Sequence, residues 1–192
     1  MTDILIYRRK DGSNADEGER RASVERIEAT VGAALPPDYR GFLISYGGGF
    51  PWPQDIALDD PAVEDLIGDD IIAIFEFYEP RIVESYSSGE YYGDATPQGF
   101  VFVADGNGVD VVMSLHDADR GALRVWARSA IPWGTPPDEA SGERGNRPED
   151  MAPLAPDFRS LLDAMEELPG SEVGRRNWEA GQNRADARVI TL

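Results

Sequence analysis

Two short helices joined by a tight link give the strongest local folding signal in the chain. The first is predicted from about Glu19 to Val31, and Gly32 favours the left-handed conformation in which many helices end. Pro37 suits the first position of the second helix, where its missing N–H costs no hydrogen bond. Large side chains recur on one face of this helix, at i, i+3, i+4 and i+7: Tyr39, Phe42, Leu43 and Tyr46. Gly47–Gly49 then end the helix, so the pair forms a packing platform and contains no catalytic constellation.

Three strands form the second predictable unit. Good strand formers dominate the segments Phe100–Ala104, Val109–Leu115 and Leu123–Arg128. Asn107-Gly108, between the first two segments, is a strong hairpin signal. The three segments predict an antiparallel meander. Together with the helices they predict an α+β fold, in which a mostly antiparallel sheet has helices packed against it.

The other elements are predicted from shorter patterns. Asp3–Arg8 is predicted as a strand at a sheet edge, and Ile71–Tyr78 as an internal strand. Asp60 resembles an N-cap and Gly68 a helix stop. Helices are therefore predicted at Pro61–Ile67, Pro80–Ser88 and Pro156–Leu168.

The length of 192 residues suits one domain with a tail. We expect a single domain over residues 1–170 and a C-terminal tail over residues 171–192. Six prolines from Pro132 to Pro156 predict a long loop within that domain. Within the tail, Arg188–Leu192 is predicted either to add a strand, beside Asp3–Arg8, or to be disordered.

The charge of the chain is strongly negative, at −18 from 36 acids and 18 bases. Such a surface repels nucleic-acid phosphates and anionic membranes, and it attracts a basic partner. The alternative is that the acids only keep the protein soluble. From Gly41 to Pro80 there is no base. The same stretch holds nine acids: Asp55, Asp59, Asp60, Glu64, Asp65, Asp69, Asp70, Glu76 and Glu79.

Several kinds of chemistry find no support in the residues. Zero cysteines exclude disulfides, thiolate metal sites and cysteine nucleophiles. The single histidine, His116, is predicted to be a solvated turn residue. Asp105, Asn107 and Asp110 begin like a calcium loop, but the twelfth position holds His116 and not glutamate. Gly47–Gly49 lack the Lys-Ser/Thr that follows a phosphate-binding loop. We expect no catalytic residue, no cofactor and no metal.

The sequence also predicts no membrane attachment. No apolar run approaches the ~20 residues that a membrane helix needs. The apolar run near the N-terminus is too short for a signal peptide. We therefore expect a cytoplasmic protein.

The helical platform and the meander resemble the SUKH superfamily, and within it the cell-wall-assembly-regulator type. The resemblance runs in the right order from about Val24 to Leu168, with one departure at Val109, where the family often keeps a glycine. It is carried by Leu35-Pro36-Pro37-Asp38-Tyr39, Phe42-Leu43, Gly47–Gly49, Phe100–Asp105, Gly108, Asp110, Val111–Leu115, Leu123–Trp126, Asp157-Phe158 and Leu161-Leu162.

This resemblance implies a non-enzymatic protein-binding module. Bacterial members are typically immunity proteins that neutralise a toxin encoded beside them, often a nuclease, and a basic toxin domain would suit this acidic chain. An intracellular scaffold or regulator, like the fungal members, is the second hypothesis, and a carbohydrate-active enzyme with paired carboxylates is the third. The oligomeric state is left open. The candidate partner-binding residues are Trp52, Asp55, Asp59, Asp60, Glu64, Asp65, Tyr86, Glu90, Tyr91 and Tyr92.

Overall fold

The computed structural model describes residues 4–7, 15–92, 96–106, 108–126, 151–182 and 187–192. The helices are α1 (Glu17–Val31), α2 (Pro37–Ser45), α3 (Pro61–Ile67), α4 (Pro80–Ser87), α6 (Phe158–Ala164) and α7 (Glu172–Gln182). The strands are β1 (Leu5–Tyr7), β2 (Phe50–Trp52), β3 (Asp55–Ala57), β4 (Ile71–Ala73), β5 (Glu76–Phe77), β6 (Phe100–Asp105), β7 (Asp110–Ser114), β8 (Leu123–Trp126), β9 (Met151–Ala155) and β10 (Arg188–Val189).

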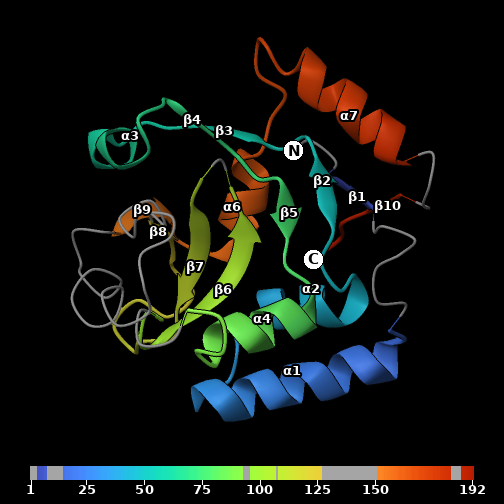
Figure 1. Ribbon diagram of the computed structural model, residues 1–192, viewed down its shortest axis with the longest axis vertical. Helices are drawn as coiled ribbons and strands as arrows, with labels where there is room; N and C mark the ends of the chain where they lie inside the picture. Colours follow the sequence, from blue (N-terminus) through green and yellow to red (C-terminus); the bar gives the residue numbers. More distant parts are fainter. Residues whose placement is uncertain (1–3, 8–14, 93–95, 107, 127–150, 183–186) are drawn as a thin grey trace.

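The strands form antiparallel sheets, which confirms the predicted α+β fold. The largest sheet has five strands in the order β5-β6-β7-β8-β9, so the predicted meander is its centre. A three-stranded sheet has the order β10-β1-β2, and β3 pairs with β4 alone. Helices α1, α2 and α4 gather at one end of the molecule, whereas α3 and α7 lie at the other (Figure 1).

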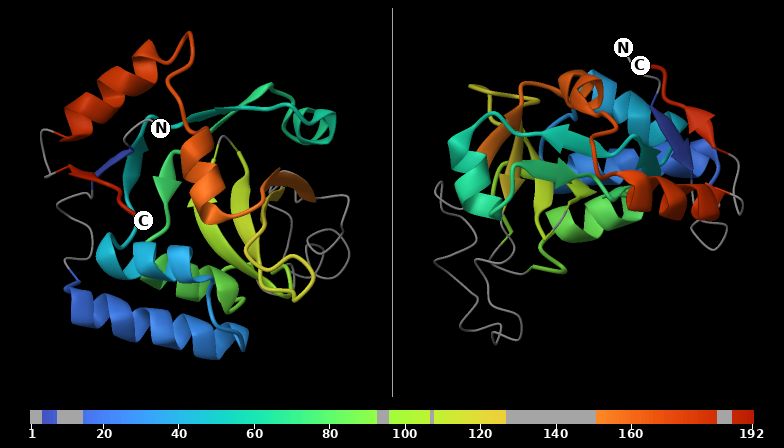
Figure 2. Two further views of the ribbon diagram at one scale, coloured as in Figure 1. Left: turned by 180° about the vertical axis from the view of Figure 1, so that it is seen from behind. Right: turned by 90° about the horizontal axis from the view of Figure 1, so that it is seen from above.

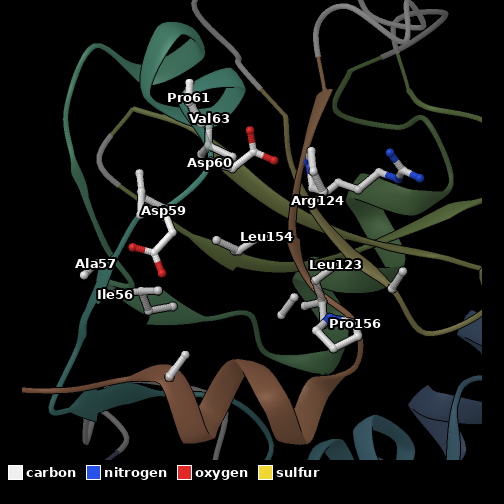
Figure 3. A pocket seen from close by; sticks show the side chains of 15 residues that line it. Ile56, Ala57, Asp59, Asp60, Pro61, Val63, Leu123, Arg124, Leu154 and Pro156 are labelled. Atoms are coloured by element: carbon white, nitrogen blue, oxygen red, sulfur yellow. The ribbon is translucent and has the colours of Figure 1, made fainter.

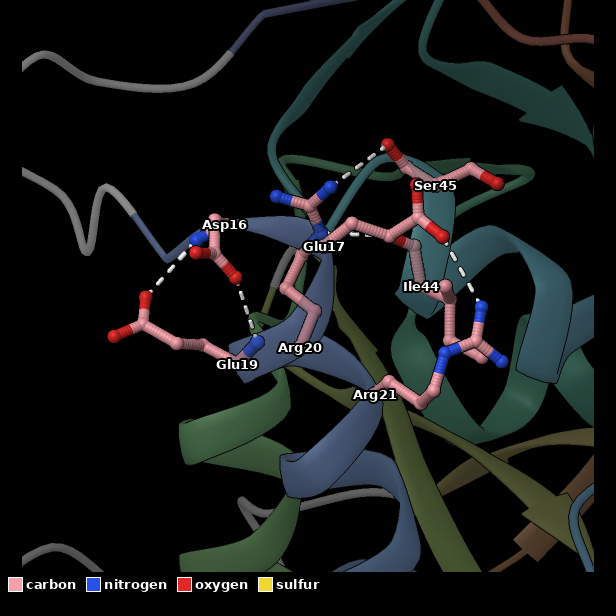
Figure 4. A network of polar contacts seen from close by, with 7 residues as sticks. All are labelled: Asp16, Glu17, Glu19, Arg20, Arg21, Ile44 and Ser45. Atoms are coloured by element: carbon pink, nitrogen blue, oxygen red, sulfur yellow. Dashed lines mark hydrogen bonds and ion pairs between the residues drawn. The ribbon is translucent and has the colours of Figure 1, made fainter.

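The helical platform begins and ends as the sequence predicts. Asp16 caps α1 in a reciprocal pair with Glu19, in which each side chain accepts from the other residue's backbone N–H at 2.9 Å. Arg20 joins α1 to the end of α2, because its Nε donates to the carbonyl of Ile44 at 2.6 Å (Figure 4). The chain leaves α1 at Gly32, in the left-handed conformation with φ 69°.

Aromatic side chains fill the core between the platform and the five-stranded sheet. Phe158 of α6 has its ring centre 5.2 Å from Tyr39, 5.0 Å from Phe42 and 5.6 Å from Phe77. All four rings are fully buried. The hydroxyl of Tyr39 donates to the carbonyl of Phe102 in β6 at 3.0 Å, which satisfies its polar group. Burial in this apolar environment raises the pKa of Tyr39.

Two predicted strands differ from the structure. Asp3–Arg8 was expected at an edge, but β1 lies between β2 and β10. The pairing with β10 confirms the alternative in which the end of the chain adds a strand beside the first one. Ile71–Tyr78 was expected as one strand and is divided, since β4 pairs with β3 while β5 joins the large sheet.

The C-terminal third holds further corrections. The loop predicted over Pro132–Pro156 is wrong for its last part, where Met151–Ala155 form strand β9. Three parts of the predictions lie outside the described residues: positions 132 to 150 of this loop, positions 127 and 128 of the third predicted strand, and Asn107 of the hairpin turn. The helix predicted to Leu168 ends at Ala164, because Met165 turns extended and Glu166 pairs with β3.

The segment after Ser171, expected as a tail, contains α7 and β10 (Figure 2). Trp178 of α7 is buried against β1 and β2. Its ring centre lies 5.5 Å from that of Tyr7 and 6.4 Å from that of Trp52, and its Nε1 donates to the carbonyl of Phe50 at 3.1 Å. These residues form a second, smaller apolar cluster beside the main core.

Candidate partner-binding surface

A two-stranded ribbon carries helix α3, which lies at the end of the molecule away from α1, α2 and α4 (Figures 1 and 2). We call residues 55–73 the β3–α3–β4 arm. Its strands pair directly, with Ile56 opposite Ile72. The carboxylate of Asp60 caps α3 by accepting from the N–H of Ala62 at 2.9 Å, as predicted. On its inner side Val63 is buried, and α3 lies against β9.

Exposed carboxylates cover the outside of this arm. Asp59 and Asp65 are exposed, whereas Asp60 and Glu64 are half-buried. Asp69 and Asp70, which belong to the same acidic run, are also exposed, where the chain leaves α3 for β4. The arm contains no lysine or arginine. Its carboxylates therefore produce a negative field that no base on the same element offsets.

Two of the predicted binding residues are interior. Trp52 is only 9% exposed and packs against Trp178. Asp55 is only 8% exposed, its carboxylate accepts a hydrogen bond from the hydroxyl of Ser171, and its carbonyl accepts from the N–H of Glu166 at 2.8 Å. These two residues fasten the C-terminal segment to the base of the arm.

A groove of about 670 Å³ lies between the arm and the last strand of the large sheet, β9. Apolar side chains make most of its lining, including Ile56 and Val63 on the arm and Leu123 and Leu154 on the sheet. Figure 3 shows Asp59 and Asp60 on the α3 side of the groove and Arg124 on the sheet side. This groove is not evident from the sequence, because it exists only where α3 approaches β9.

Arg124 is paired with a carboxylate of the turn between β7 and β8. Its guanidinium contacts the carboxylate of Asp119 at 2.7 Å, and the hydroxyl of Ser114 donates to the same carboxylate. The Ser114 hydrogen bond, followed by the hydrogen bond from Arg124, lowers the pKa of Asp119 below its usual range. The positive charge of Arg124 is thus already balanced, which leaves the acids of the arm as the net charge beside the groove.

Four of the predicted binding residues, Tyr86, Glu90, Tyr91 and Tyr92, lie together around a cluster of stacked tyrosines. Tyr86 of α4 has its ring centre 4.6 Å from that of Tyr91 and 5.2 Å from that of Tyr92. Tyr91 is 64% exposed, and Glu90 beside it is also exposed. Tyr92 is half-buried against Phe102. The structure therefore brings these four residues of α4 and the following loop together, and the ring of Tyr91 is open to solvent.

Asp110 is a residue of this cluster that the sequence did not mark as part of the site. It is fully buried at the start of β7, where the hydroxyl of Tyr92 donates to its carboxylate at 2.7 Å and the hydroxyl of Tyr78 donates to the other oxygen. The sequence does contain a signal that Asp110 is a buried hydrogen-bond acceptor, because it lies directly between Val109 and Val111. A carboxylate within an apolar strand needs hydrogen-bond partners. The tyrosine loop is thereby tied to the sheet.

The alternatives considered from the sequence can be located as well. His116 is exposed, with its ring edge against Phe100. The backbone of Gly49 exchanges two hydrogen bonds with Phe77, at 2.9 and 2.8 Å, so the glycine run is used for packing. Among the residues that the structure describes, no group of three or more acids and histidines is placed to hold a metal ion. Within the same residues, no helix has the length and apolar character needed to cross a membrane.

Comparison with known proteins places these features in a family context. The model of the SMI1 / KNR4 family (SUKH-1) matches residues 20–164. The matched region runs from α1 to the end of α6 and includes the arm, the groove and the tyrosine cluster. Strands β1 and β10 and helix α7 lie outside it. No curated protein matches the chain.

Proposed function

Because the chain belongs to the SMI1 / KNR4 family (SUKH-1), we propose that it is a non-enzymatic protein-binding module with a basic protein as its partner. The observation that carries this proposal is the β3–α3–β4 arm, on which exposed carboxylates occur without a single base. A partner with a positive surface gains favourable electrostatic energy along this arm. The net charge of −18 extends the attraction beyond the contact itself.

The specific form of the proposal is an immunity protein that binds and neutralises a cognate bacterial toxin in the cytoplasm. A nuclease toxin suits the charge, because an enzyme that binds nucleic-acid phosphates presents a basic surface. An acidic module that covers this surface blocks access of the substrate. Steered association of this kind reaches ~10⁸ M⁻¹s⁻¹ or more at low salt, which suits a protein that must capture a toxin before it acts.

The binding residues proposed on the arm are Asp59, Asp60, Glu64 and Asp65. The tyrosine cluster is the second proposed contact, since exposed Tyr91 beside Glu90 offers an aromatic anchor next to a negative charge. Tyrosine is enriched among residues that dominate binding energy, and it accepts an arginine over its ring. Trp52 and Asp55 support the arm from inside the fold and act on binding only through it.

The test is co-purification of the tagged protein with the product of the neighbouring gene, at low and at moderate salt. We expect a stable complex that weakens as salt rises, followed by inhibition of the partner's nuclease activity in the presence of this chain. A folded protein that captures no neighbouring gene product would favour the scaffold or regulator function of the family. In that outcome the acidic arm serves solubility.

A further inference from the structure

We infer that the groove between α3 and β9 receives an extended segment of the partner, in which a basic side chain lies next to an apolar one. The inference rests on the proposed function and adds where and in what form the partner is held. Three independent properties of the groove support it: its apolar lining, the edge of β3 that faces away from β4, and the sign of the charge beside it.

The apolar lining requires an apolar side chain in the occupant. Ile56, Val63 and Leu123 are buried residues of the core whose surfaces also line the groove. Its volume of about 670 Å³ lies within the range of ~300–1,000 Å³ that is typical of ligand sites. Burial of one large aliphatic side chain here removes its apolar surface from water, which favours binding.

The backbone of β3 favours an extended occupant. Gln54 and Leu58 make their hydrogen bonds toward β4, through Ile74 N–H to Gln54 C=O at 2.7 Å and Leu58 N–H to Asp70 C=O at 2.9 Å. Because successive residues of a strand point their backbone groups to opposite edges, the N–H and C=O of Ala57 face away from β4.

The edge that Ala57 faces already accepts an extended chain at one point. Asp55, two residues earlier on that edge, pairs there with Glu166 in an antiparallel bridge. Helix α6 ends at Ala164, two residues before Glu166. Both Ala164 and Ala57 line the groove. A partner segment that follows the same edge would continue the pairing from Asp55 to Ala57, which is the usual geometry of strand addition.

The charge beside the groove selects a basic occupant. Asp59 and Asp60 line the groove from the arm side. Among the described lining residues the one base is Arg124, and its charge is balanced by Asp119. A lysine or arginine of the partner would therefore meet two carboxylates, whereas an acidic segment would be repelled by them.

The inference is tested with a synthetic probe before any partner is known. A short labelled peptide in which arginine and valine alternate is titrated into the full chain, and binding is followed by fluorescence anisotropy and by backbone amide shifts. A peptide of alternating glutamate and valine serves as the charge control. We expect the arginine peptide to bind in a salt-dependent manner, with the largest shifts at Ala57, Leu58 and Leu154, and the glutamate peptide not to bind.

Two tryptophan substitutions separate the groove from general charge attraction. Ala57→Trp fills the groove from an exposed position on β3, and Ala62→Trp places the same side chain on α3 at an exposed position that does not line it. We expect Ala57→Trp to weaken peptide binding at least about tenfold, as loss of a central contact does, and Ala62→Trp to leave it nearly unchanged. Ala164→Trp blocks the opposite wall and replaces Ala57→Trp if that variant fails to fold.

Equal binding by the wild type and the blocked variants, or shifts confined to other surfaces, would overturn the inference. Absence of binding by the arginine peptide would overturn it as well. Co-purification with Ala57→Trp distinguishes this failure from failure of the proposed function. A partner captured equally by the wild type and by Ala57→Trp removes the groove but leaves the binding function, whereas no capture by the wild type removes the function itself.

Discussion

The hydroxyl of Ser171 donates a hydrogen bond to the buried carboxylate of Asp55, and this contact joins the start of the C-terminal segment to the base of the acidic arm. The carbonyl of Asp55 is held as well, by the N–H of Glu166. The arm is therefore anchored by a segment that lies 116 residues further along the chain. Any partner that binds the arm acts on a surface whose position depends on this anchor.

Asp55→Ala is expected to destabilise the protein by about 1–3 kcal/mol, because it leaves the Ser171 hydroxyl without this acceptor and removes buried atoms. Asp70→Ala, at an exposed position of the same arm, should change stability by no more than about 0.5 kcal/mol. Urea unfolding measures both. Faster amide exchange in β3 and β4 of the Asp55 variant would show that the arm loosens, and equal stabilities for the two variants would contradict the anchor.

Neutralisation of the arm is expected to slow capture of the partner. Asp59→Asn, Asp60→Asn, Glu64→Gln and Asp65→Asn together remove four negative charges, and asparagine at position 60 preserves the helix cap. The association rate at low salt should fall about tenfold, with less change in dissociation. Stopped-flow mixing with the co-purified partner measures the rate.

The matched control for the arm removes four charges from other exposed positions, on α1 and α7. These are changed in Glu17→Gln, Glu25→Gln, Glu172→Gln and Glu179→Gln. A small effect of the control and a large effect of the arm variant is the expected pattern. Equal slowing by both would mean that total charge, and not the arm, directs association.

Phe158 is expected to be a major contributor to stability. Its ring contacts three other buried aromatic rings, so Phe158→Ala opens a cavity at the centre of the core. The expected loss is about 3–5 kcal/mol. Phe75→Ala, at a phenylalanine that is 44% exposed, should cost much less. Denaturant midpoints of the two variants give the comparison, and similar losses would show that the aromatic cluster is not the stabilising core.

Gly48 and Gly32 distinguish two reasons why a position requires glycine: a left-handed backbone conformation and a lack of space for a Cβ atom. Both have positive φ, at 81° and 69°. A Cβ at Gly48 would lie 2.6 Å from the carbonyl oxygen of Phe77, whereas one at Gly32 would meet nothing within 4 Å. Gly32→Ala should therefore cost only the backbone term of about 1–2 kcal/mol, and Gly48→Ala about 2–5 kcal/mol once overpacking is added. Thermal unfolding tests this order, and an equal loss would exclude the steric explanation.

Asp119 is expected to make the protein less stable in acid. The hydrogen bond from Ser114 and the contact with Arg124 lower its folded pKa, so its contribution is fully present above the ordinary aspartate pKa of about 4. That contribution is lost as pH falls through the lowered value. Asp119→Asn should reduce stability at neutral pH and flatten the decline below about pH 4. Urea unfolding of the wild type and of Asp119→Asn over a range of pH measures both changes, and identical pH profiles for the two proteins would contradict the prediction.

Local signals account for most of what the sequence predicted correctly. The bounds of α3 follow from Asp60, Pro61 and Gly68, which act within a few residues of themselves. The acidic outside of the arm follows in the same way, because charged side chains on a short helix seldom become buried. Caps, turns and charge are properties of neighbouring residues, so a single sequence reveals them.

Long-range packing accounts for what was missed. Trp52 was predicted to be a surface anchor, but Trp178 packs against it. Asp55 was predicted to be an exposed carboxylate of the arm, but it accepts a hydrogen bond from Ser171. Strand β9 was not predicted, because Pro153 argues against a strand. Proline is tolerated there because β9 is at the edge of its sheet. The groove was missed for the same reason, since its two walls come from distant parts of the chain.

The position of β1 between β2 and β10 has a consequence for synthesis on the ribosome. β1 is made early, but one of its edges cannot pair until β10 has been made. Closure of so long a loop is slow, and an unpaired strand edge can pair with another molecule in the meantime. Pairing with β10 thus removes an edge at which newly made protein could associate with another molecule.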